Sequence, residues 1–267
     1  MTDMREEILS RLSPGYPWRE LLAYKPSVGS TNDILKELAR QGASQGTALV
    51  AGHQSDGHGR RGRSFSSPPD MGVYLSILLR PKCSPSELMH MTCAVAVAMC
   101  DAVESAAGFR PGIKWTNDLV CGKRKLGGIL TELVIDRGIV EGCVIGIGIN
   151  CCHKCEDFPP ELRDMAASLA MIAGSPVSRA GLAAAMLDAL HRMNETLISG
   201  KEETLSRYRR DCITLGQEVS LVRGEEVRHA LALDIDSSGA LLVRLPTGQV
   251  EAINSGEVSV RGMYGYI

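Results

Sequence analysis

The chain of 267 residues is long enough for one large domain, or for a domain with a small module, and it can bury a substantial core. Apolar residues make up 44% of the chain and charged residues 22%, and 29 Lys and Arg against 31 Asp and Glu give a formal net charge of −2. These values exclude an intrinsically disordered chain, and they argue against a protein whose main partner is nucleic acid, because such proteins usually carry a basic surplus.

Cysteine usage and apolar runs indicate the compartment. The nine cysteines show no framework spacing, and the first 20 residues are charged without an apolar run, so no secretory signal is expected. The longest uninterrupted apolar run, Cys93–Cys100, is far shorter than the roughly 20 residues that a membrane span needs. We expect a cytoplasmic protein with reduced thiols and no membrane partner.

The first elements can be predicted from caps, breakers and periodicity. Residues 1–24 have the composition of a short leader, in which prolines and a glycine break any helix. The first expected helix begins at the polar caps of Ser30-Thr31-Asn32-Asp33 and stops at Gly42. Strands are expected at 47–52 and 73–79.

The rest of the chain alternates between helical and β patterns. Beyond residue 80 we expect a buried helix at 86–107, antiparallel strands at 112–115, 126–134 and 139–149, and helices at 161–171 and 178–210. Short β runs then follow at 219–222, 227–235, 241–245 and 250–253, which indicate a small barrel-like module. The expected division is a leader at 1–24, a main domain at 25–212 and a β domain at 213–267.

The first candidate site lies in the connection at 53–70, which is polar, punctuated by glycine and long for an ordinary loop. Its centre is Gly57-His58-Gly59-Arg60-Arg61-Gly62-Arg63. Glycines let backbone N–H groups approach an anion, and arginines donate paired hydrogen bonds to carboxylate or phosphate. The alternative is a solvated basic surface loop.

Two further stretches contain residues that are unusual in strands. Lys114-Trp115-Thr116-Asn117-Asp118, followed by Lys125-Leu126-Gly127-Gly128, can hold a cation near a carboxylate and an amide, or it can be a hairpin with charges in its turn. Gly146-Ile147-Gly148-Ile149-Asn150 alternates glycine within a strand. This pattern predicts a ligand or another backbone packed closely against the strand, or else a β-bulge.

In this order and at these separations, the stretches resemble the motifs of the biotin–protein ligase family. The resemblance runs from about Ser30 to Asn150 and includes Ser30-Thr31-Asn32 and Gln54. It implies an α+β fold with a mixed, mainly antiparallel sheet flanked by helices, as in the class II synthetase-like biotin/lipoate ligase domains. The β-rich tail is similar to the family's small SH3-like β-barrel domain.

The resemblance implies a two-step reaction. The carboxylate of biotin attacks the α-phosphorus of ATP to give biotinyl-5′-adenylate and pyrophosphate, and a lysine of a biotin carboxyl carrier domain then attacks the acyl carbon and releases AMP. The first step brings an anion to a polyanion, so cations and Mg²⁺ are expected, with the metal ligands unassigned. The implied partners are biotin, ATP and the carrier domain of a carboxylase, and the family includes both monomers and homodimers.

The resemblance also assigns roles to residues. The expected catalytic residues are Lys125 and Arg60, which contact the carboxylate and adenylate, and Asp118, which orients the carrier lysine or is a structural hairpin carboxylate. The expected biotin-binding residues are Ser30, Thr31, Asn32, Gln54, Gly57, His58, Gly59, Arg60, Lys125 and Gly128. The expected adenylate-binding residues are Arg60, Arg61, Arg63, Trp115, Asn117, Lys125 and Asn150. Ser30 and Thr31 have an alternative role as helix caps.

Some positions depart from the family pattern. The family has arginine where this chain has His58, and tryptophan where it has Phe65. Histidine is shorter and mostly neutral at pH 7, so adenylate retention is expected to be weaker, unless a backbone contact at His58 or the charge of Arg60 or Arg61 compensates. Thr116 in place of the usual proline is a minor change, and Trp115 is expected to pack beneath the site, because a buried tryptophan is normally part of the core.

Other functions and a possible metal site also have to be weighed. Because 29 residues precede Ser30, we expect no DNA-reading domain and no repressor role. A lipoate or octanoate ligase of the same superfamily and a non-enzymatic carrier-binding protein are the remaining alternatives, and the arginine loop with Lys125 favours the biotin enzyme. The cluster Cys151-Cys152-His153-x-Cys155 could suggest zinc, but no second ligand pair follows, so metal binding is not expected there.

Overall fold

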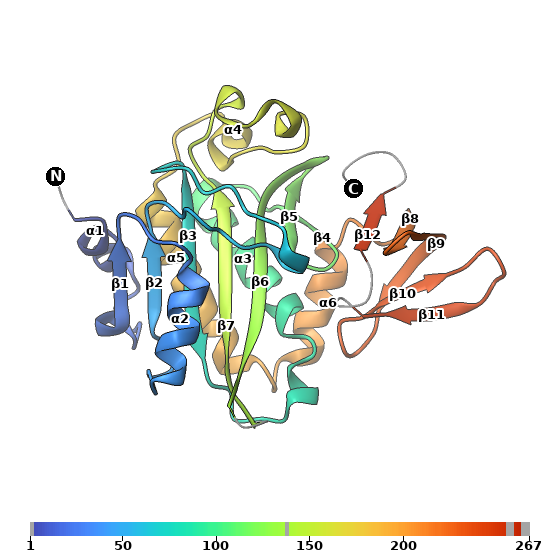
Figure 1. The fold of residues 1–267 in the computed structure, drawn as a ribbon, viewed down its shortest axis with the longest axis horizontal. Coiled ribbons are helices and arrows are strands. Elements are labelled where there is room, and N and C mark those ends of the chain that lie inside the picture. Colours follow the sequence, from blue (N-terminus) through green and yellow to red (C-terminus); the bar gives the residue numbers. More distant parts are fainter. Residues whose placement is uncertain (1–2, 137–138, 255–258, 263–267) are drawn as a thin grey trace.

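The computed structural model describes residues 3–136, 139–254 and 259–262 (Figure 1). Within these residues, a seven-stranded sheet flanked by helices forms a large domain, and a five-stranded sheet forms a C-terminal domain beside it. This architecture confirms the expected fold class. The connection between the strands expected at 126–134 and 139–149 lies partly outside the described residues.

The large sheet has the strand order β1-β2-β3-β7-β6-β5-β4, and among the described pairs only β1 and β2 run parallel. Its strands are β1 (Leu22–Lys25), β2 (Ala48–Ala51), β3 (Gly72–Leu79), β4 (Gly112–Lys114), β5 (Asp118–Cys121), β6 (Arg124–Asp136) and β7 (Ile139–Asn150). β5 was not expected. A tight turn at residues 115–117 reverses the chain after β4, so Asp118 begins a separate strand.

Helices cover both faces of this sheet (Figure 1). The described α-helices are α1 (Met4–Arg11), α2 (Thr31–Arg40), α3 (Met91–Ala107), α4 (Leu169–Ala173), α5 (Arg179–Thr196) and α6 (Lys201–Asp211). α3 and α5 pack together over the main core, and α2 lies on the opposite face, where Leu35 and Ala39 contact a second apolar cluster. By length and composition Pro85–Ala107 could cross a membrane, but 72% of its most apolar stretch is buried inside the protein, which accounts for its composition.

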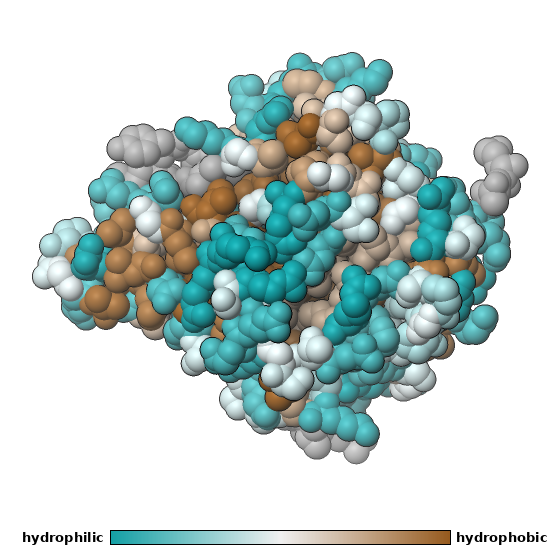
Figure 2. All heavy atoms as spheres, turned by 180° about the vertical axis from the view of Figure 1, so that it is seen from behind, coloured by the Kyte–Doolittle hydropathy of each residue, from teal (hydrophilic) through white to brown (hydrophobic). Residues whose placement is uncertain are grey.

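The C-terminal domain contains more strand than the sequence patterns indicated. Its strands are β8 (Glu218–Arg223), β9 (Glu226–Ile235), β10 (Leu241–Arg244), β11 (Val250–Ile253) and β12 (Ser259–Gly262), in the order β11-β10-β9-β8-β12. β8 to β11 match the expected runs, and β12 was not expected. Figure 2 shows the reverse face of the molecule, on which hydrophobic residues are exposed over this domain. Val227 and Val250 of this domain are exposed over 53% and 54% of their surface.

The N-terminal residues are part of the large domain, so the expected leader is wrong. α1 ends at Arg11, before the expected helix breakers, and it packs against α5. Ile8 and Leu12 are buried in the main core, and β1 pairs with β2 at the edge of the sheet. The proline and glycine that follow Arg11 limit the length of this helix and do not prevent it.

Two long helices were predicted with wrong bounds. The helix expected at 86–107 begins at Met91, after a separate 3-10 turn at Pro85–Leu88. The helix expected at 178–210 is divided into α5 and α6 by an irregular segment that ends at Gly200. Glycine is a poor helix former, which explains why the pattern does not continue through it.

The helix expected at 161–171 is mostly wrong. Only a 3-10 turn at Pro160–Leu162 and the first residues of α4 are helical within that range. The chain between them pairs with Lys125, whose N–H donates to the carbonyl of Met165 (2.7 Å) and whose carbonyl accepts from Ala167 (2.9 Å). The backbone of Lys125 is therefore fixed by a segment that does not belong to the β5–β6 hairpin.

An ion-pair cluster joins α3 to α6. Arg110 lies 2.7 Å from Asp211 (Nη2 to Oδ2) and 2.8 Å from Asp101 (Nη1 to Oδ1), and the side chain of Asp211 is 7% exposed. Burial alone raises the pKa of Asp211, but hydrogen bonds from Arg110 and Arg210 outweigh it, and the pKa is lowered. The ionised form is therefore the stabilising one.

We expect Asp211→Asn to lower the free energy of unfolding at pH 7 by about 2 kcal/mol, the typical value of a hydrogen bond to a charged group. Because the folded-state pKa lies below the unfolded one, this contribution is present above the unfolded pKa and is lost as the pH falls through the folded pKa. Denaturant unfolding at several pH values measures this, and the difference in the free energy of unfolding between the variant and the wild type should shrink as the pH falls. Glu203→Gln, on the exposed face of α6, is the control, and a pH-independent gap for Asp211→Asn contradicts the prediction.

Candidate active site

The three stretches singled out in the sequence meet in one pocket of about 500 Å³, which is partly open to solvent. It lies on the face of the large sheet that carries α2. Its lining residues are Ser30, Thr31, Asn32, Gln54, His58, Gly59, Arg60, Phe65, Asn117, Lys125, Gly128, Ile129, Leu130, Gly146, Ile147 and Gly148. The pocket therefore combines a helix N-terminus, the glycine–arginine loop and the middle of the sheet.

Gly146 and Gly148 of β7 form part of the floor of the pocket, where other side chains lie directly against the strand. A Cβ atom at Gly146 would lie well under 3.0 Å from Asn32 Oδ1, and one at Gly148 would overlap the ring of Phe65. The close neighbours predicted for this strand are thus the side chains of Asn32 and Phe65 and not another backbone. The pairing with β3 and β6 keeps its register through these positions, so the alternative of a β-bulge is wrong for this part of β7.

Cationic side chains lie together at the β5–β6 end of the pocket. Lys125 Nζ is 2.7 Å from Asp118 Oδ1, and Arg60 Nη1 donates to Asn117 Oδ1 at 2.8 Å. Asn117 Nδ2 in turn donates to the carbonyl of Ile129 (2.9 Å), which ties the β4–β5 turn to β6. Burial lowers the pKa of Arg60; attraction by Asp118 acts in the opposite direction. The guanidinium remains charged, because an arginine pKa lies far above neutrality. This end of the pocket is suited to an anion.

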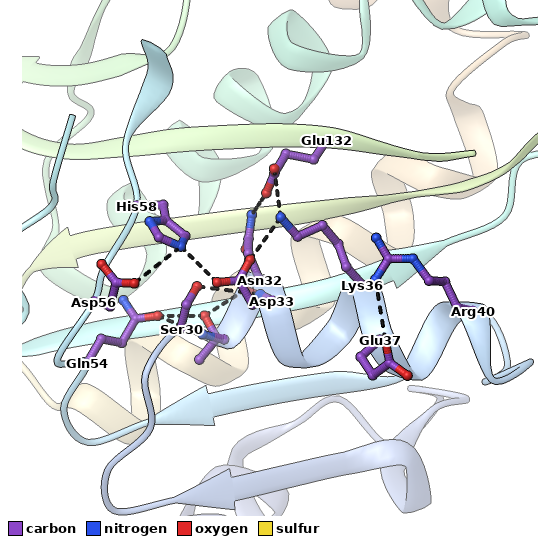
Figure 3. A network of polar contacts seen from close by, with 12 residues as sticks. Ser30, Asn32, Asp33, Lys36, Glu37, Arg40, Gln54, Asp56, His58 and Glu132 are labelled. Carbon is purple, nitrogen blue, oxygen red and sulfur yellow. Dashed lines mark hydrogen bonds and ion pairs between the residues drawn. The ribbon is translucent and has the colours of Figure 1, made fainter. Parts of the chain in front are cut away.

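Polar side chains lie at the α2 end (Figure 3). Ser30 caps α2, since its Oγ accepts from the N–H of Asp33 at 3.4 Å, which confirms the expected cap. The N–H and the hydroxyl of Thr31 both donate to Gln54 Oε1 at 2.9 Å. Asn32 Nδ2 donates to Glu132 Oε2 at 2.8 Å. This end offers hydrogen-bonding groups next to the aliphatic side chain of Leu130.

The loop residues are divided between the pocket and its surroundings. His58 lines the pocket, and its Nε2 lies 2.8 Å from Asp33 Oδ2 in the first turn of α2 (Figure 3). Gly57 is buried beneath the loop, where a Cβ would overlap the carbonyl of Phe65. Arg61 and Arg63 are exposed and do not line the pocket.

Trp115 and Asn150 also lie outside the pocket. Trp115 is 5% exposed, its indole N–H donates to the carbonyl of Gly239 (3.1 Å), and its backbone N–H donates to Thr214 Oγ1 (2.9 Å). Asn150 is 7% exposed and donates to the carbonyl of Ala167 at 3.1 Å. Trp115 is thus a buried residue that joins the motif to the C-terminal domain, and the adenylate contacts expected for Trp115 and Asn150 stay predictions.

The sequence patterns did not point to Ser76, Glu132 or Lys36. Ser76 is fully buried in β3 and contacts the side chains of Thr31 and Asn32, while Glu132 on β6 also accepts from Lys36. One signal was present in the sequence. A serine in the apolar run 73–79 and a glutamate in the run 126–134 are polar residues in predicted core strands, and buried polar groups require partners.

The cysteine cluster after β7 has no metal-site geometry. The thiols of Cys151 and Cys152 approach the carbonyl of Val177, and the ring of His153 stacks on Phe158. Across the part of the chain that the structure describes, no group of three or more His, Cys, Asp or Glu side chains is placed to hold a metal ion.

Known proteins with similar sequences and structures were found for both domains. The Biotin/lipoate A/B protein ligase family matches residues 24–150, and the Biotin protein ligase C terminal domain matches residues 214–261. The chain is 32% identical over 240 residues to the Bifunctional ligase/repressor BirA of Bacillus spizizenii, which covers 90% of this chain and 74% of that protein. It is 29% identical over 254 residues to the Biotin--[acetyl-CoA-carboxylase] ligase of Mycobacterium tuberculosis, with 92% and 91% covered. The biotin protein ligase of Aquifex aeolicus, solved in complex with biotin and ATP, superposes with a TM-score of 0.78 at 29% identity, covering 90% of this chain and 98% of that chain.

Proposed function

Because the chain belongs to the biotin protein ligase family, we propose that it activates biotin as biotinyl-5′-adenylate and transfers the biotinyl group to a lysine of a biotin carboxyl carrier domain. Its ligase activity on biotin and ATP follows from the family. One observation supports the finer proposal most directly. The pocket has hydrogen-bonding groups at one end and Lys125 with Arg60 at the other, which suits a ligand with a polar ring and a carboxylate. We propose that the reaction takes place in the cytoplasm.

In the first step, the carboxylate of biotin attacks the α-phosphorus of ATP, and pyrophosphate leaves. Both reactants are anions, so the barrier is lowered chiefly by orientation and by fixed positive charge. In our proposal Lys125 contacts the carboxylate and the α-phosphate, and Arg60 holds the adenylate from the loop. The Arg60–Asn117 hydrogen bond (2.8 Å) supports this role, because it fixes the guanidinium at the cationic end before any ligand binds.

In the second step, the amine of a carrier lysine attacks the acyl carbon, and AMP leaves. Asp118 is our candidate for orienting that amine, since its carboxylate already holds the ammonium of Lys125 at 2.7 Å. Mg²⁺ would enter with ATP and neutralise phosphate charge. Mg²⁺ usually takes one or two carboxylates together with phosphates and water, and Asp118, which is paired with Lys125, would be available to it only if that pair opened.

Biotin-dependent exchange of labelled pyrophosphate into ATP tests the proposal. We expect exchange with biotin, none with lipoate or octanoate, and transfer of biotin to a carrier domain only when the acceptor lysine is present. Exchange driven by octanoate or lipoate, with none driven by biotin, would overturn the assignment to biotin and favour the alternative within the superfamily.

His58→Arg is expected to slow release of the adenylate by about fivefold, equivalent to about 1 kcal/mol for a partly exposed ion pair. The reason is that arginine is longer than histidine and carries a permanent charge, so it can reach past Asp33 to the phosphate. Release of labelled adenylate from isolated enzyme measures the rate. His229→Arg, on an exposed strand of the C-terminal domain, is the control. An unchanged or faster release rate for His58→Arg contradicts the prediction.

A further inference from the structure

Four oxygen atoms form a short chain at the α2 end of the pocket. Thr31 Oγ1 lies 2.9 Å from Gln54 Oε1 and 2.7 Å from Ser76 Oγ, and Ser76 Oγ lies 2.5 Å from Asn32 Oδ1. All three separations are within hydrogen-bonding distance. Each requires one proton between the two oxygens, so the chain as a whole requires three.

The orientation of the two amides in this chain is set by groups outside it. Gln54 Oε1 also accepts from the backbone N–H of Thr31 at 2.9 Å, so its oxygen and not its nitrogen faces Thr31. Asn32 donates through Nδ2 to Glu132 at 2.8 Å (Figure 3), and Glu132 is held by the ammonium of Lys36 at 2.9 Å. An ionised carboxylate only accepts hydrogen bonds, so the oxygen of Asn32 faces Ser76.

The number of protons in the chain is therefore smaller than the number of contacts. Amide oxygens bring no proton, and the hydroxyls of Thr31 and Ser76 bring one each, which makes two protons for three contacts. Both hydroxyl protons are therefore used within the chain, and none is left over for a ligand, so this wall offers acceptor oxygens only. A ligand N–H group that reaches this wall would find a partner there.

The surroundings of Ser76 indicate that its hydroxyl has a positioning role. Ser76 is paired in register with Gly146 of β7, which is paired in turn with Leu130 of β6. The missing side chain at Gly146 leaves the space that the amide of Asn32 occupies. A fully buried hydroxyl loses hydration on folding, so it is unfavourable unless it is used.

We propose that Ser76 and Glu132 are positioning residues that make this pocket selective for a ligand carrying N–H groups. Glu132 sets the orientation of the Asn32 amide, and Ser76 joins that amide to Thr31, so the wall presents acceptor oxygens and no spare donor. The inference rests on the proposed function, because the cyclic urea of biotin has two N–H groups. An octanoyl or dithiolane acyl chain has none, and it would cover these acceptor oxygens without donating to them.

The test compares biotin with a cyclic-ketone analogue in which both ureido N–H groups are replaced by CH₂. Isothermal titration gives the ratio of the two dissociation constants for the wild type, Ser76→Ala and Glu132→Gln. We expect the wild type to prefer biotin by more than about 100-fold, and each variant to reduce that preference about tenfold. The reduction should come from weaker binding of biotin, because glutamine at 132 lets the Asn32 amide turn and donate to Ser76.

Further measurements distinguish a positioning role of Ser76 from a loss of folding or stability. Ser76→Thr, which keeps a hydroxyl, should retain the preference, and the exposed Ser10→Ala is the matched surface control. In pyrophosphate exchange, Ser76→Ala should raise the KM for biotin and leave the KM for ATP unchanged. Thermal unfolding checks that each protein is folded, and Glu132→Gln, at a partly exposed position, keeps the test available if Ser76→Ala does not fold.

The outcomes distinguish this inference from the function on which it rests. Unchanged preference for biotin in both Ser76→Ala and Glu132→Gln, with normal binding of biotin by the wild type, overturns the inference alone. A wild-type protein that binds the ketone analogue as tightly as biotin also overturns it. A wild-type protein that does not bind biotin overturns the proposed function.

Discussion

Replacing Lys125 with alanine is expected to reduce biotin-dependent ATP–pyrophosphate exchange by about 100- to 1,000-fold, the usual cost of removing one group that stabilises charge in a transition state. Lys125 is held at the cationic end of the pocket from two directions. Its backbone pairs with Met165 and Ala167, and its ammonium lies 2.7 Å from Asp118. The charge is therefore already placed before the reactants bind, which is the condition for a large effect.

The matched variant for this experiment is Lys123→Ala, in the exposed turn between β5 and β6. It removes the same charge at a position outside the pocket, and its exchange rate should equal that of the wild type. Lys125→Arg should recover only part of the activity, because a planar guanidinium does not place its charge where an ammonium does. If Lys125→Ala retains more than about a tenth of the wild-type rate, Lys125 does not have the role proposed here.

Replacing Gly146 with alanine is expected to weaken biotin binding by about 100-fold, equivalent to about 2.7 kcal/mol. The new Cβ would overlap Asn32 Oδ1, so the amide would have to leave both Ser76 and Glu132. β7 cannot yield, because it is paired on both sides with β3 and β6. The free energy of unfolding should also fall by about 1–3 kcal/mol, as expected for overpacking.

Titration calorimetry and thermal unfolding measure these effects. Gly15→Ala is the control, since a Cβ there meets no atom within 4 Å. Gly148→Ala should have the smaller effect, because the side chain that it displaces, Phe65, belongs to a loop and can move. Binding of biotin by Gly146→Ala with wild-type affinity contradicts the assignment of Asn32 to the biotin end of the pocket.

Features of the fold that depend on neighbours in the sequence were predictable. The cap at Ser30 and the stop at Gly42 define α2, and alternating or continuous apolar runs define β3 and β7. The ordered motifs also predicted most of the pocket, because most of the residues expected to bind biotin do line it. Caps, glycines and strand periods are local properties, and they operate whatever the rest of the chain does.

Other features depended on contacts between distant segments. α1 is a mostly polar helix, and only its packing against α5, far along the chain, makes Ile8 a core residue. Segment 161–171 had a helical pattern, and its pairing with Lys125 prevailed over that pattern. Trp115 is directed to the C-terminal domain by its bond to Gly239. Propensity is a weak preference that tertiary contacts override.

The same division applies to the site. Local motifs were enough to nominate Thr31, Asn32 and Lys125, because these residues belong to recognisable stretches of sequence. The roles of Ser76 and Glu132 came only from the tertiary structure, where the register of β3, β7 and β6 places them on either side of Asn32. Which side chain faces another across a sheet depends on strand register and order, and these are set by the packing of the whole domain.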